Sequence, residues 1–342
     1  MKALRKNKAE KGAEFVDIPI PEIDEHELLV QIKATAMCKS DIEVFEWTPL
    51  VQDLHLPIPV TMGHEFAGEI IQTGKLVKGF KKGDRIAGET HIPCGHCREC
   101  RTGNQHICTN GMRVLGRSSN GSFAEYIAIH EKAAIPLPSD ADYIESSLYE
   151  PMATAIHSLQ KAEPQGCNIA ILGVGTIGLM ACEAAKALGA STVIAFSRNQ
   201  KRLDYSLQIG ADIAINGTDC NFADEVKKHV DHLDAVIDMT GSPSVINQAI
   251  DALSIAGRLV CVGMIENELT IPDFMYRVVY RELKITGIFG RHMYTTWDIM
   301  ESLIRNKRIH LANYIGATMP LDDYKKAMAD FDQLNGRAVL IP

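Results

Sequence analysis

The chain has 342 residues, of which 46% are hydrophobic and 23% charged. This is the balance of a globular protein of about two domains, and it excludes a disordered or disulfide-dense chain. The 35 basic and 43 acidic side chains give a formal charge of -8 and a pI near 5.8, which with the lack of a long basic run argues against nucleic acid as a partner.

The start of the chain and its longest apolar run predict a cytoplasmic protein with no membrane association. Residues 1–12 are charged and lack the apolar core of a signal peptide. The longest apolar run, 169–182, is interrupted by three glycines and is too short to cross a bilayer. In the cytoplasm, the nine cysteines are expected to be thiols or metal ligands before they are disulfides.

Short strands separated by Gly, Pro and charged turns are predicted in the first part of the chain, at 28–34, 68–73 and 85–88. From about residue 152, strands alternate with helical segments. Six strands are predicted there, at 169–172, 192–196, 213–215, 235–238, 258–262 and 284–288. This alternation favours a doubly wound parallel sheet, so we expect an α/β protein.

The last segment contains a predicted amphipathic helix at 295–306, with Ile299, Met300, Leu303 and Ile304 on one face, and a strand at 337–341. We expect this tail to return to the first domain rather than to extend the parallel sheet. The predicted domains are therefore 1–151 completed by 290–342, and 152–289.

A glycine motif follows the first strand of the predicted parallel sheet. Gly173, Gly175 and Gly178 form G-x-G-x-x-G, with Thr176 and Ile177 before the third glycine. An Ala-rich helix follows and Gly189 ends it. Because a strand precedes the motif and a helix and strand follow it, the motif predicts a site where a dinucleotide pyrophosphate meets a helix N-terminus. The alternative is an ordinary Gly-rich turn.

The end of the next strand predicts which dinucleotide is bound. An NAD site has an acidic residue there, which accepts a hydrogen bond from the ribose 2′-hydroxyl, whereas a 2′-phosphate requires a nearby cation. This chain has Ser197 and Arg198, followed by Lys201 and Arg202. We therefore predict NADP(H) in preference to NAD(H); the alternative is that these cations form a solvated helix start.

Four cysteines lie in one short polar segment, at positions 94, 97, 100 and 108 (Cys94, Cys97, Cys100, Cys108). Four thiolates complete a tetrahedral shell around zinc and leave no position open, so this pattern predicts a structural zinc. An iron–sulfur cluster needs similar ligands and is the main competitor. Disulfides or idle thiols are the other alternative.

A second set of possible zinc ligands is scattered: Cys38, His64, Glu65 and Glu150. Cys, His and carboxylate are the donors of a catalytic zinc, which keeps one position open. Spacing alone cannot assemble these residues. Taken singly, they could be a core thiol, a turn histidine and surface acids.

Further motifs supply a family resemblance that covers nearly the whole chain in matching order. They are Cys38-Lys39-Ser40-Asp41, Gly63-His64-Glu65, Glu89-Thr90-His91-Ile92-Pro93-Cys94-Gly95-His96-Cys97, Glu150-Pro151 and Gly290-Arg291-His292. With the four-Cys segment and the glycine motif, they resemble the zinc-dependent medium-chain dehydrogenases, most closely the threonine 3-dehydrogenase and sorbitol dehydrogenase branch.

That resemblance implies a GroES-like catalytic domain, a Rossmann domain and two zinc ions per chain. Cys38, His64 and Glu65 would hold the catalytic zinc, and Glu150 would be a fourth ligand or a partner of the zinc-bound water. Ser40 would bond the substrate oxygen and begin a proton relay; its alternative is a plain cap serine. Branch members are commonly tetramers, so we expect a homotetramer, with a dimer as the alternative.

Three departures from threonine dehydrogenases separate this chain from them. Lys39 replaces Gly after the zinc cysteine and could reach the cofactor pyrophosphate. Glu43 replaces a relay histidine, and its lower intrinsic pKa makes it a poorer proton carrier at neutral pH unless it is buried. Ile315-Gly316-Ala317 replaces an Ile-Thr-His pattern.

The sequence thus predicts a zinc-dependent reductase or dehydrogenase that uses NADP(H) and acts on a small polar secondary alcohol or ketone, such as a polyol or ketose. Oxidation of L-threonine or a similar β-hydroxy amino acid is the alternative, and Arg291 could then hold the substrate carboxylate or form a salt bridge instead. A rival of another class is an NADP-binding sensor or quinone oxidoreductase-like protein with decayed zinc sites, and the preserved ligand set argues against it. A purely structural role is a further alternative.

Overall fold

The computed structural model describes residues 1–265 and 267–342 and divides them into two compact units. The first unit comprises Met1–Pro151 and Leu311–Pro342, and the second comprises Met152–His310. Among the described residues, no helix is long and apolar enough to cross a membrane. All nine cysteines lie in the described part of the chain, and none of them forms a disulfide there.

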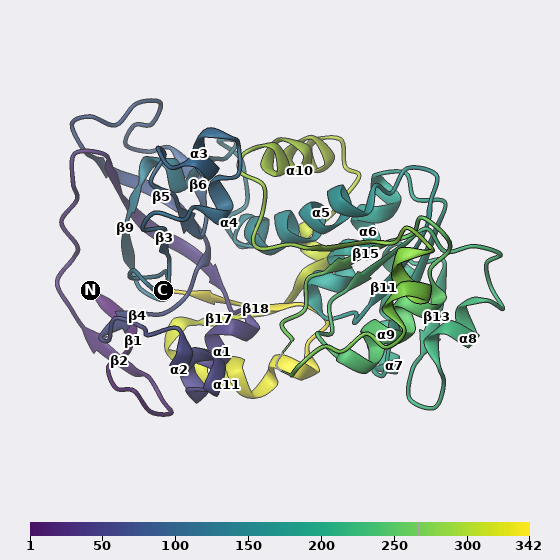
Figure 1. Ribbon diagram of the computed structural model, residues 1–342. Helices are drawn as coiled ribbons and strands as arrows, with labels where there is room; N and C mark the ends of the chain where they lie inside the picture. The colour runs from purple at the N-terminus through teal and green to yellow at the C-terminus, as the bar shows by residue number, and fades with distance from the viewer. Residues whose placement is uncertain (266) are drawn as a thin grey trace. The chain divides into compact units, whose positions relative to one another are not determined.

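The second unit is built on a parallel sheet with the order β13-β12-β11-β14-β15-β16 and helices on both sides of it (Figure 1). Its strands are β11 (Asn168–Leu172), β12 (Thr192–Ser197), β13 (Ile213–Asn216), β14 (Ala235–Asp238), β15 (Arg258–Cys261) and β16 (Lys284–Gly287). Counted from β11, this is the 3-2-1-4-5-6 order of a Rossmann sheet. The predicted α/β fold is confirmed, and no strand end differs from its prediction by more than one residue.

Helices cover the sheet because each crossover between parallel strands must return along a face. They are α5 (Tyr149–Ala162), α6 (Thr176–Ala187), α7 (Gln200–Ile209), α8 (Phe222–Val226), α9 (Pro243–Ala252) and α10 (Thr295–Arg305), with a π-helix at Met275–Val279. The Ala-rich α6 begins after Gly175 and ends before Gly189, whose φ of 95° is left-handed. Phe196 and Phe222 pack edge to face, with ring centroids 5.1 Å apart, in the apolar core.

The first unit is centred on β3 (Glu27–Ala36) and β5 (Glu65–Thr73), which pair antiparallel. Leu28, Val30 and Ile32 alternate along β3 and pack in a core with Phe66 and Ile70. The sheet has the order β10-β6-β5-β3-β18-β17, and β9 also pairs with β3. The remaining strands are β1 (Lys2–Lys6), β2 (Glu14–Asp17), β4 (Val60–Thr61), β6 (Arg85–Gly88), β7 (His91–Ile92), β8 (Arg113–Val114), β9 (Tyr126–His130), β10 (Ala134–Pro136), β17 (Ile315–Pro320) and β18 (Arg337–Ile341).

Short helices connect these strands: α1 (Lys39–Glu46), α2 (Pro49–Asp53), α3 (Arg98–Arg101), α4 (Tyr143–Ser146) and α11 (Tyr324–Asp330). A second apolar cluster unites the start of the chain, α1 and the C-terminal segment, through Leu4, Val44, Tyr324 and Leu340. The last strand, β18, pairs with β3 at Thr35 and Ala36. The two ends of the chain are therefore held in one core.

The boundary between the two compact units lies later in the chain than the predicted domain boundary at residue 290. Residues 290–310 belong to the second compact unit, and the chain joins the first unit only from Leu311. Polar contacts within the second unit account for this, since Thr296 Oγ1 donates to Gln160 Oε1 at 2.7 Å and His310 N donates to Glu183 Oε2 at 3.2 Å. In α10 the buried side chains are Thr296, Trp297 and Met300, while Ile299, Leu303 and Ile304 are half-buried.

Candidate metal centres and cofactor site

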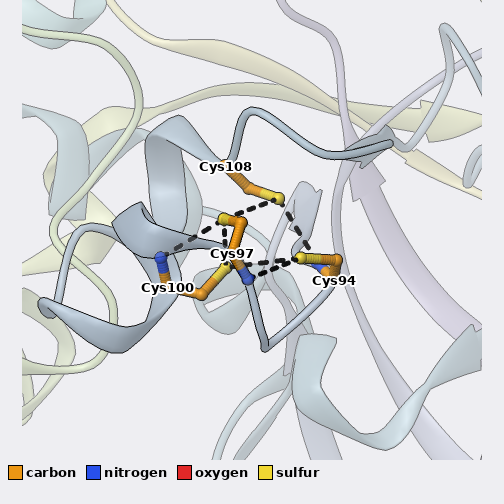
Figure 2. Close-up of side chains that lie close together, drawn as sticks. All are labelled: Cys94, Cys97, Cys100 and Cys108. Atoms are coloured by element: carbon orange, nitrogen blue, oxygen red, sulfur yellow. Dashed lines mark hydrogen bonds between the residues drawn. The ribbon is translucent and has the colours of Figure 1, made fainter.

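The four cysteines of the polar segment lie together in the first unit (Figure 2). Cys97 is the N-cap of α3, Cys100 lies within that helix, and Cys108 follows a short 3-10 turn. Their Sγ atoms all lie within 4.8 Å of one another, with Cys97–Cys100 at 3.4 Å and Cys94–Cys100 at 3.9 Å. Four sulfurs 2.3 Å from a tetrahedral zinc would be about 3.8 Å apart, so the cluster fits zinc.

Backbone amides surround these sulfurs, as suits thiolates. His96 N and Cys97 N point to Cys94 Sγ at 3.4 and 3.3 Å. The amide of His96 is the main cause that lowers the pKa of the Cys94 thiol to about 6. Burial instead raises the pKa of the Cys100 thiol to about 12. A bound cation is the group that would hold all four sulfurs in the thiolate form.

A second ligand group joins Cys38, His64 and Glu65, whose ligand atoms also lie within 4.8 Å of one another. Cys38 is the N-cap of α1, directly after β3, and Glu65 opens β5. The sheet register pairs Ala36 with Glu65, which brings the two ends of these strands together. The sequence could not assemble this group from spacing, and the fold does so through β-pairing.

Gly63 makes the approach of His64 possible. It has a φ of 87°, and a Cβ at this position would lie 2.4 Å from the ring of Phe123. Glycine alone meets both demands without displacing its neighbour. The Gly-His-Glu motif therefore has a local steric reason as well as a chemical one.

Two charged side chains that the sequence analysis did not assign complete this group. Asp41 Oδ1 lies 3.4 Å from His64 Nδ1, and Asp41 Oδ2 accepts from Cys38 N at 2.9 Å. Arg337 Nε and Nη2 donate to the two oxygens of Glu65 at 3.0 and 2.7 Å, and Nη2 also lies 3.6 Å from Cys38 Sγ. Asp41 carried a sequence signal, its place three residues after the N-cap; Arg337 carried none.

These charges set the protonation of the group. Burial by itself would raise the pKa of the Cys38 thiol, but the Arg337 guanidinium and His64 outweigh burial and lower it to about 6. Burial likewise would lower the pKa of His64, and the Asp41 carboxylate instead raises it well above its ordinary value. Cys38 is therefore favoured as a thiolate, the form that binds zinc, whereas His64 must release its extra proton before a ring nitrogen can bind the metal.

The other predicted catalytic residues lie outside this ligand group. Glu150, in the first turn of α5, is buried and accepts from Thr90 Oγ1 at 2.7 Å. Its direct ligation of zinc stays a prediction. Ser40 is half-buried in the first turn of α1, Glu43 is buried on the same helix, and Lys39 is exposed.

The glycine motif lines a cavity of about 470 Å³ in the second unit. Its wall includes Gly173, Gly175, Ser197, Arg198 and Arg202. Thr176 is buried and Ile177 half-buried, and neither belongs to the described lining.

Two of the glycines are sterically required at this cavity. Gly173 has a φ of 91°, and a Cβ on Gly178 would lie 2.1 Å from the carbonyl oxygen of Gly173. The turn therefore stays tight and its backbone open to a phosphate at the start of α6.

Arg291 lies away from the solvent. It is 1% exposed, its Nη1 donates to Thr154 Oγ1 at 3.3 Å, and its guanidinium lies 5.9 Å from the ring centroid of Trp297. These contacts favour a packing role in the second unit over capture of a substrate carboxylate.

Two family models match the chain. The model described as "Alcohol dehydrogenase GroES-like domain" matches residues 24–139, and the one described as "Zinc-binding dehydrogenase" matches residues 176–306.

Curated relatives share the full length. An L-threonine 3-dehydrogenase from Shewanella sp. (strain MR-7) is 37% identical over 328 residues, which cover 95% of both chains. An L-threonine 3-dehydrogenase from Bacillus subtilis (strain 168) is 36% identical over 100% of this chain and 99% of its own.

Solved structures share the fold. Galactitol-1-phosphate dehydrogenase from Escherichia coli has a TM-score of 0.91 at 25% identity and covers 100% of both chains. A zinc-binding dehydrogenase from Sinorhizobium meliloti 1021, bound to NADP, has a TM-score of 0.90 at 25% identity and covers 100% of this chain and 99% of its own.

Proposed function

The chain belongs to the zinc-dependent medium-chain dehydrogenases, in the threonine 3-dehydrogenase and sorbitol dehydrogenase-like branch, and we propose that it interconverts a small polar secondary alcohol and its ketone with NADP(H). Alcohol CH–OH dehydrogenation follows from the family. The observation that carries the proposal is the group of half-buried Cys38 with buried His64 and Glu65, together with its charged partners. A polyol or ketose is the substrate class proposed.

Cys38 Sγ, a ring nitrogen of His64 and a Glu65 oxygen would hold the catalytic zinc. When bound, zinc would be the Lewis acid that lowers the pKa of the substrate hydroxyl, and the nicotinamide would be the donor or acceptor of the hydride. Asp41 lies 3.4 Å from His64 Nδ1, which would leave Nε2 for the metal. Arg337 balances the charge of Glu65 and orients its carboxylate.

Proton transfer is assigned to α1. Ser40, two residues after Cys38, bonds the substrate oxygen and passes its proton toward solvent. Glu43, buried one turn further on the same helix, is the proposed second carrier. Lys39 is exposed at the start of the helix and is assigned to the cofactor pyrophosphate.

NADP(H) preference is proposed from the cavity wall, where Arg198 and Arg202 accompany Ser197 and no acidic side chain is among the described lining residues. Two cations suit a 2′-phosphate. Arg198→Ala should lower kcat/KM with NADP⁺ at least tenfold and leave kcat/KM with NAD⁺ nearly unchanged, with Lys228→Ala as a surface control. A wild-type preference for NAD⁺ would overturn this part of the proposal.

L-threonine 3-dehydrogenase activity is the second candidate. It is favoured by the names of relatives that are 36–37% identical over nearly the whole chain. Lys39, Glu43 and Gly316 are the positions at which the sequence departs from threonine dehydrogenases, and they argue against this candidate. Assaying polyols, 2,3-diols and L-threonine side by side with both cofactors separates the candidates, and turnover of L-threonine alone would refute the polyol proposal.

Self-association is proposed through the free edge of β16. Tyr276, Tyr280 and Phe289 are 71%, 66% and 54% exposed, and Ile285 of β16 is 38% exposed. Exposed apolar side chains gathered beside a sheet edge mark protein–protein interaction sites. A homotetramer is proposed, and a dimer is the alternative.

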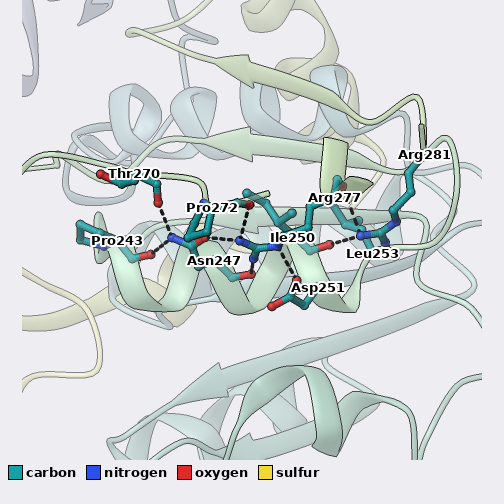
Figure 3. Close-up of polar contacts among 9 residues, drawn as sticks. All are labelled: Pro243, Asn247, Ile250, Asp251, Leu253, Thr270, Pro272, Arg277 and Arg281. Carbon is teal, nitrogen blue, oxygen red and sulfur yellow. Dashed lines mark hydrogen bonds and ion pairs between the residues drawn. The ribbon is translucent and has the colours of Figure 1, made fainter. Parts of the chain in front are cut away.

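Polar contacts hold this surface rigid (Figure 3). Arg277 donates to Asp251 Oδ1 and to the side-chain and main-chain oxygens of Asn247, each at 2.8 Å, and Arg281 donates to Ile250 O at 2.8 Å. The segment from 275 to 281 is thereby fixed on α9. Light scattering should show that Tyr280→Glu reduces the mass of the assembly, whereas Leu207→Glu, a control on exposed α7, does not.

A further inference from the structure

Thr90 is held in one place by its surroundings. It lies between β6 and β7, in a segment where Glu89 N donates to Ala133 O at 2.8 Å and Leu115 N donates to Thr90 O at 3.0 Å. Thr90 itself is 5% exposed. A β-branched side chain has few χ1 positions, so the fixed backbone also fixes its hydroxyl.

The hydroxyl donates to Glu150, 60 residues further along the chain. The Oγ1–Oε1 distance of 2.7 Å is that of a good hydroxyl–carboxylate hydrogen bond. Glu150 is 8% exposed, so solvent competes little for the same oxygen. Because one carboxylate oxygen is assigned to Thr90, rotation of the carboxylate is restricted and the direction of Oε2 is set.

Strand pairing brings this hydrogen bond toward the Cys38–His64–Glu65 group. The antiparallel pairing of β5 with β6, with Ala67 opposite Ala87, brings the start of β5 at Glu65 next to the segment after β6 that holds Thr90 and its partner Glu150. Yet the oxygens of Glu150 lie outside the ligand group itself. The carboxylate therefore stands beside the centre, and its orientation is fixed from outside by Thr90.

We propose that Thr90 is a positioning residue of the catalytic centre: its hydroxyl bond to Glu150 Oε1 sets how that carboxylate faces the Cys38–His64–Glu65 zinc site. The inference rests on the proposed function, because the orientation matters only if this group binds zinc. Hydrogen-bond partners of metal-site carboxylates characteristically change metal affinity or activity by 10–100-fold when removed. A merely structural Thr90 would change stability alone.

The test compares Thr90→Val, which keeps the shape and removes the hydroxyl, with Thr90→Ser, which restores it. Zinc release to a chromophoric chelator is followed in the full-length, zinc-loaded protein. The four-cysteine site provides an internal reference, since Thr90 does not contact it in the described contacts. Thr218→Val, which removes an exposed hydroxyl bond of 2.7 Å in the second unit, is the control.

Thr90→Val should release the zinc of the Cys38–His64–Glu65 group about tenfold faster and leave release from the four-cysteine site unchanged. It should also reduce kcat by a similar factor at nearly constant KM for the cofactor. Thr90→Ser should restore both rates. If Thr90→Val only lowers the melting temperature and leaves zinc release and kcat as in the wild type, the inference is refuted. If the wild type holds no zinc at this group or has no dehydrogenase activity, the proposed function fails instead.

Discussion

Buried charged side chains contact the ligands of the candidate zinc site. Arg337 is 3% exposed and meets Glu65 with two hydrogen bonds, although 272 residues separate them. Such a pair is costly to desolvate, and it persists because each charge has a partner. Asp41 has a similar role for His64. At this scale, function depends on groups that touch the ligands as much as on the ligands themselves.

Arg337→Ala should destabilise the zinc-loaded protein by about 3–5 kcal/mol, because it leaves the Glu65 carboxylate buried without its partner. Denaturant unfolding measures the change. Arg308→Ala removes an exposed arginine that bonds Ala187 O at 3.3 Å, and it should cost less than about 0.5 kcal/mol. Equal effects of the two variants would contradict the assigned role of Arg337.

His157 should make stability depend on pH. Burial lowers its pKa to about 4, with Lys161, His292 and Arg291 adding to that effect while a bond to Gly290 O opposes it. Between about pH 6.5 and 4 the unfolded chain therefore binds a proton that the folded chain refuses, and stability falls as pH falls.

His157→Gln should remove this contribution, about 1.4 kcal/mol per pH unit in the window. Unfolding free energies measured at several pH values between 4.5 and 7 provide the check. His229→Gln, at an exposed position, should keep the wild-type slope. An unchanged slope in His157→Gln would show that other groups govern the pH dependence.

At the scale of helices and strands, the pairing of β3 with β5 and the turns at their ends bring the candidate zinc ligands together. The antiparallel pairing of β3 with β5 aligns Ala36 with Glu65, and the start of α1 places Cys38 beside them. Gly63 lets the chain enter β5 at φ 87° under the Phe123 ring. The position of His64 is thus a property of the strand junction.

Gly63→Ala should disturb this junction far more than Gly79→Ala. Both glycines have a φ of 87°, but a Cβ at Gly63 meets the Phe123 ring while one at Gly79 meets nothing within 4 Å. Gly79→Ala should cost about 1 kcal/mol for the positive φ alone, and Gly63→Ala should cost more than about 2 kcal/mol and weaken zinc binding. Thermal melts and zinc content give the comparison, and equal costs would mean that the ring moves aside freely.

At the scale of the whole molecule, the two units carry different chemistry. Both candidate zinc groups belong to the first unit, and the glycine motif with its cavity belongs to the second. The first unit is closed by β18, so the zinc site draws on both ends of the chain. Metal binding and folding of this unit are therefore expected to be linked.

Elemental analysis should find about two zinc ions per chain. Cys38→Ser should lose one zinc and the activity while keeping the fold. Cys100→Ser should lose the zinc of the four-cysteine site and lower the unfolding temperature, because that zinc would stabilise a loop and would not contact substrate. A wild-type content of about one zinc would mean that one of the two groups does not bind metal.

The sequence by itself determined the features that depend on neighbours along the chain. The clustering of the four cysteines, the glycine turn and the strands of the parallel sheet could be predicted, because short spacings and periodicity along the chain determine them. The doubly wound parallel sheet that they predicted is confirmed, and so is the zinc-dehydrogenase family that the wider set of motifs resembles.

Only the tertiary structure decided which distant groups meet. The bonds from Arg337 to Glu65 and from Thr90 to Glu150, and the packing of 290–310 in the second unit, depend on strand register and on how connections return. Buried charges must find partners wherever the fold places them, since desolvation penalises a lone charge. No pattern of neighbouring residues predicts these pairs, although they orient and charge the side chains of the candidate zinc site.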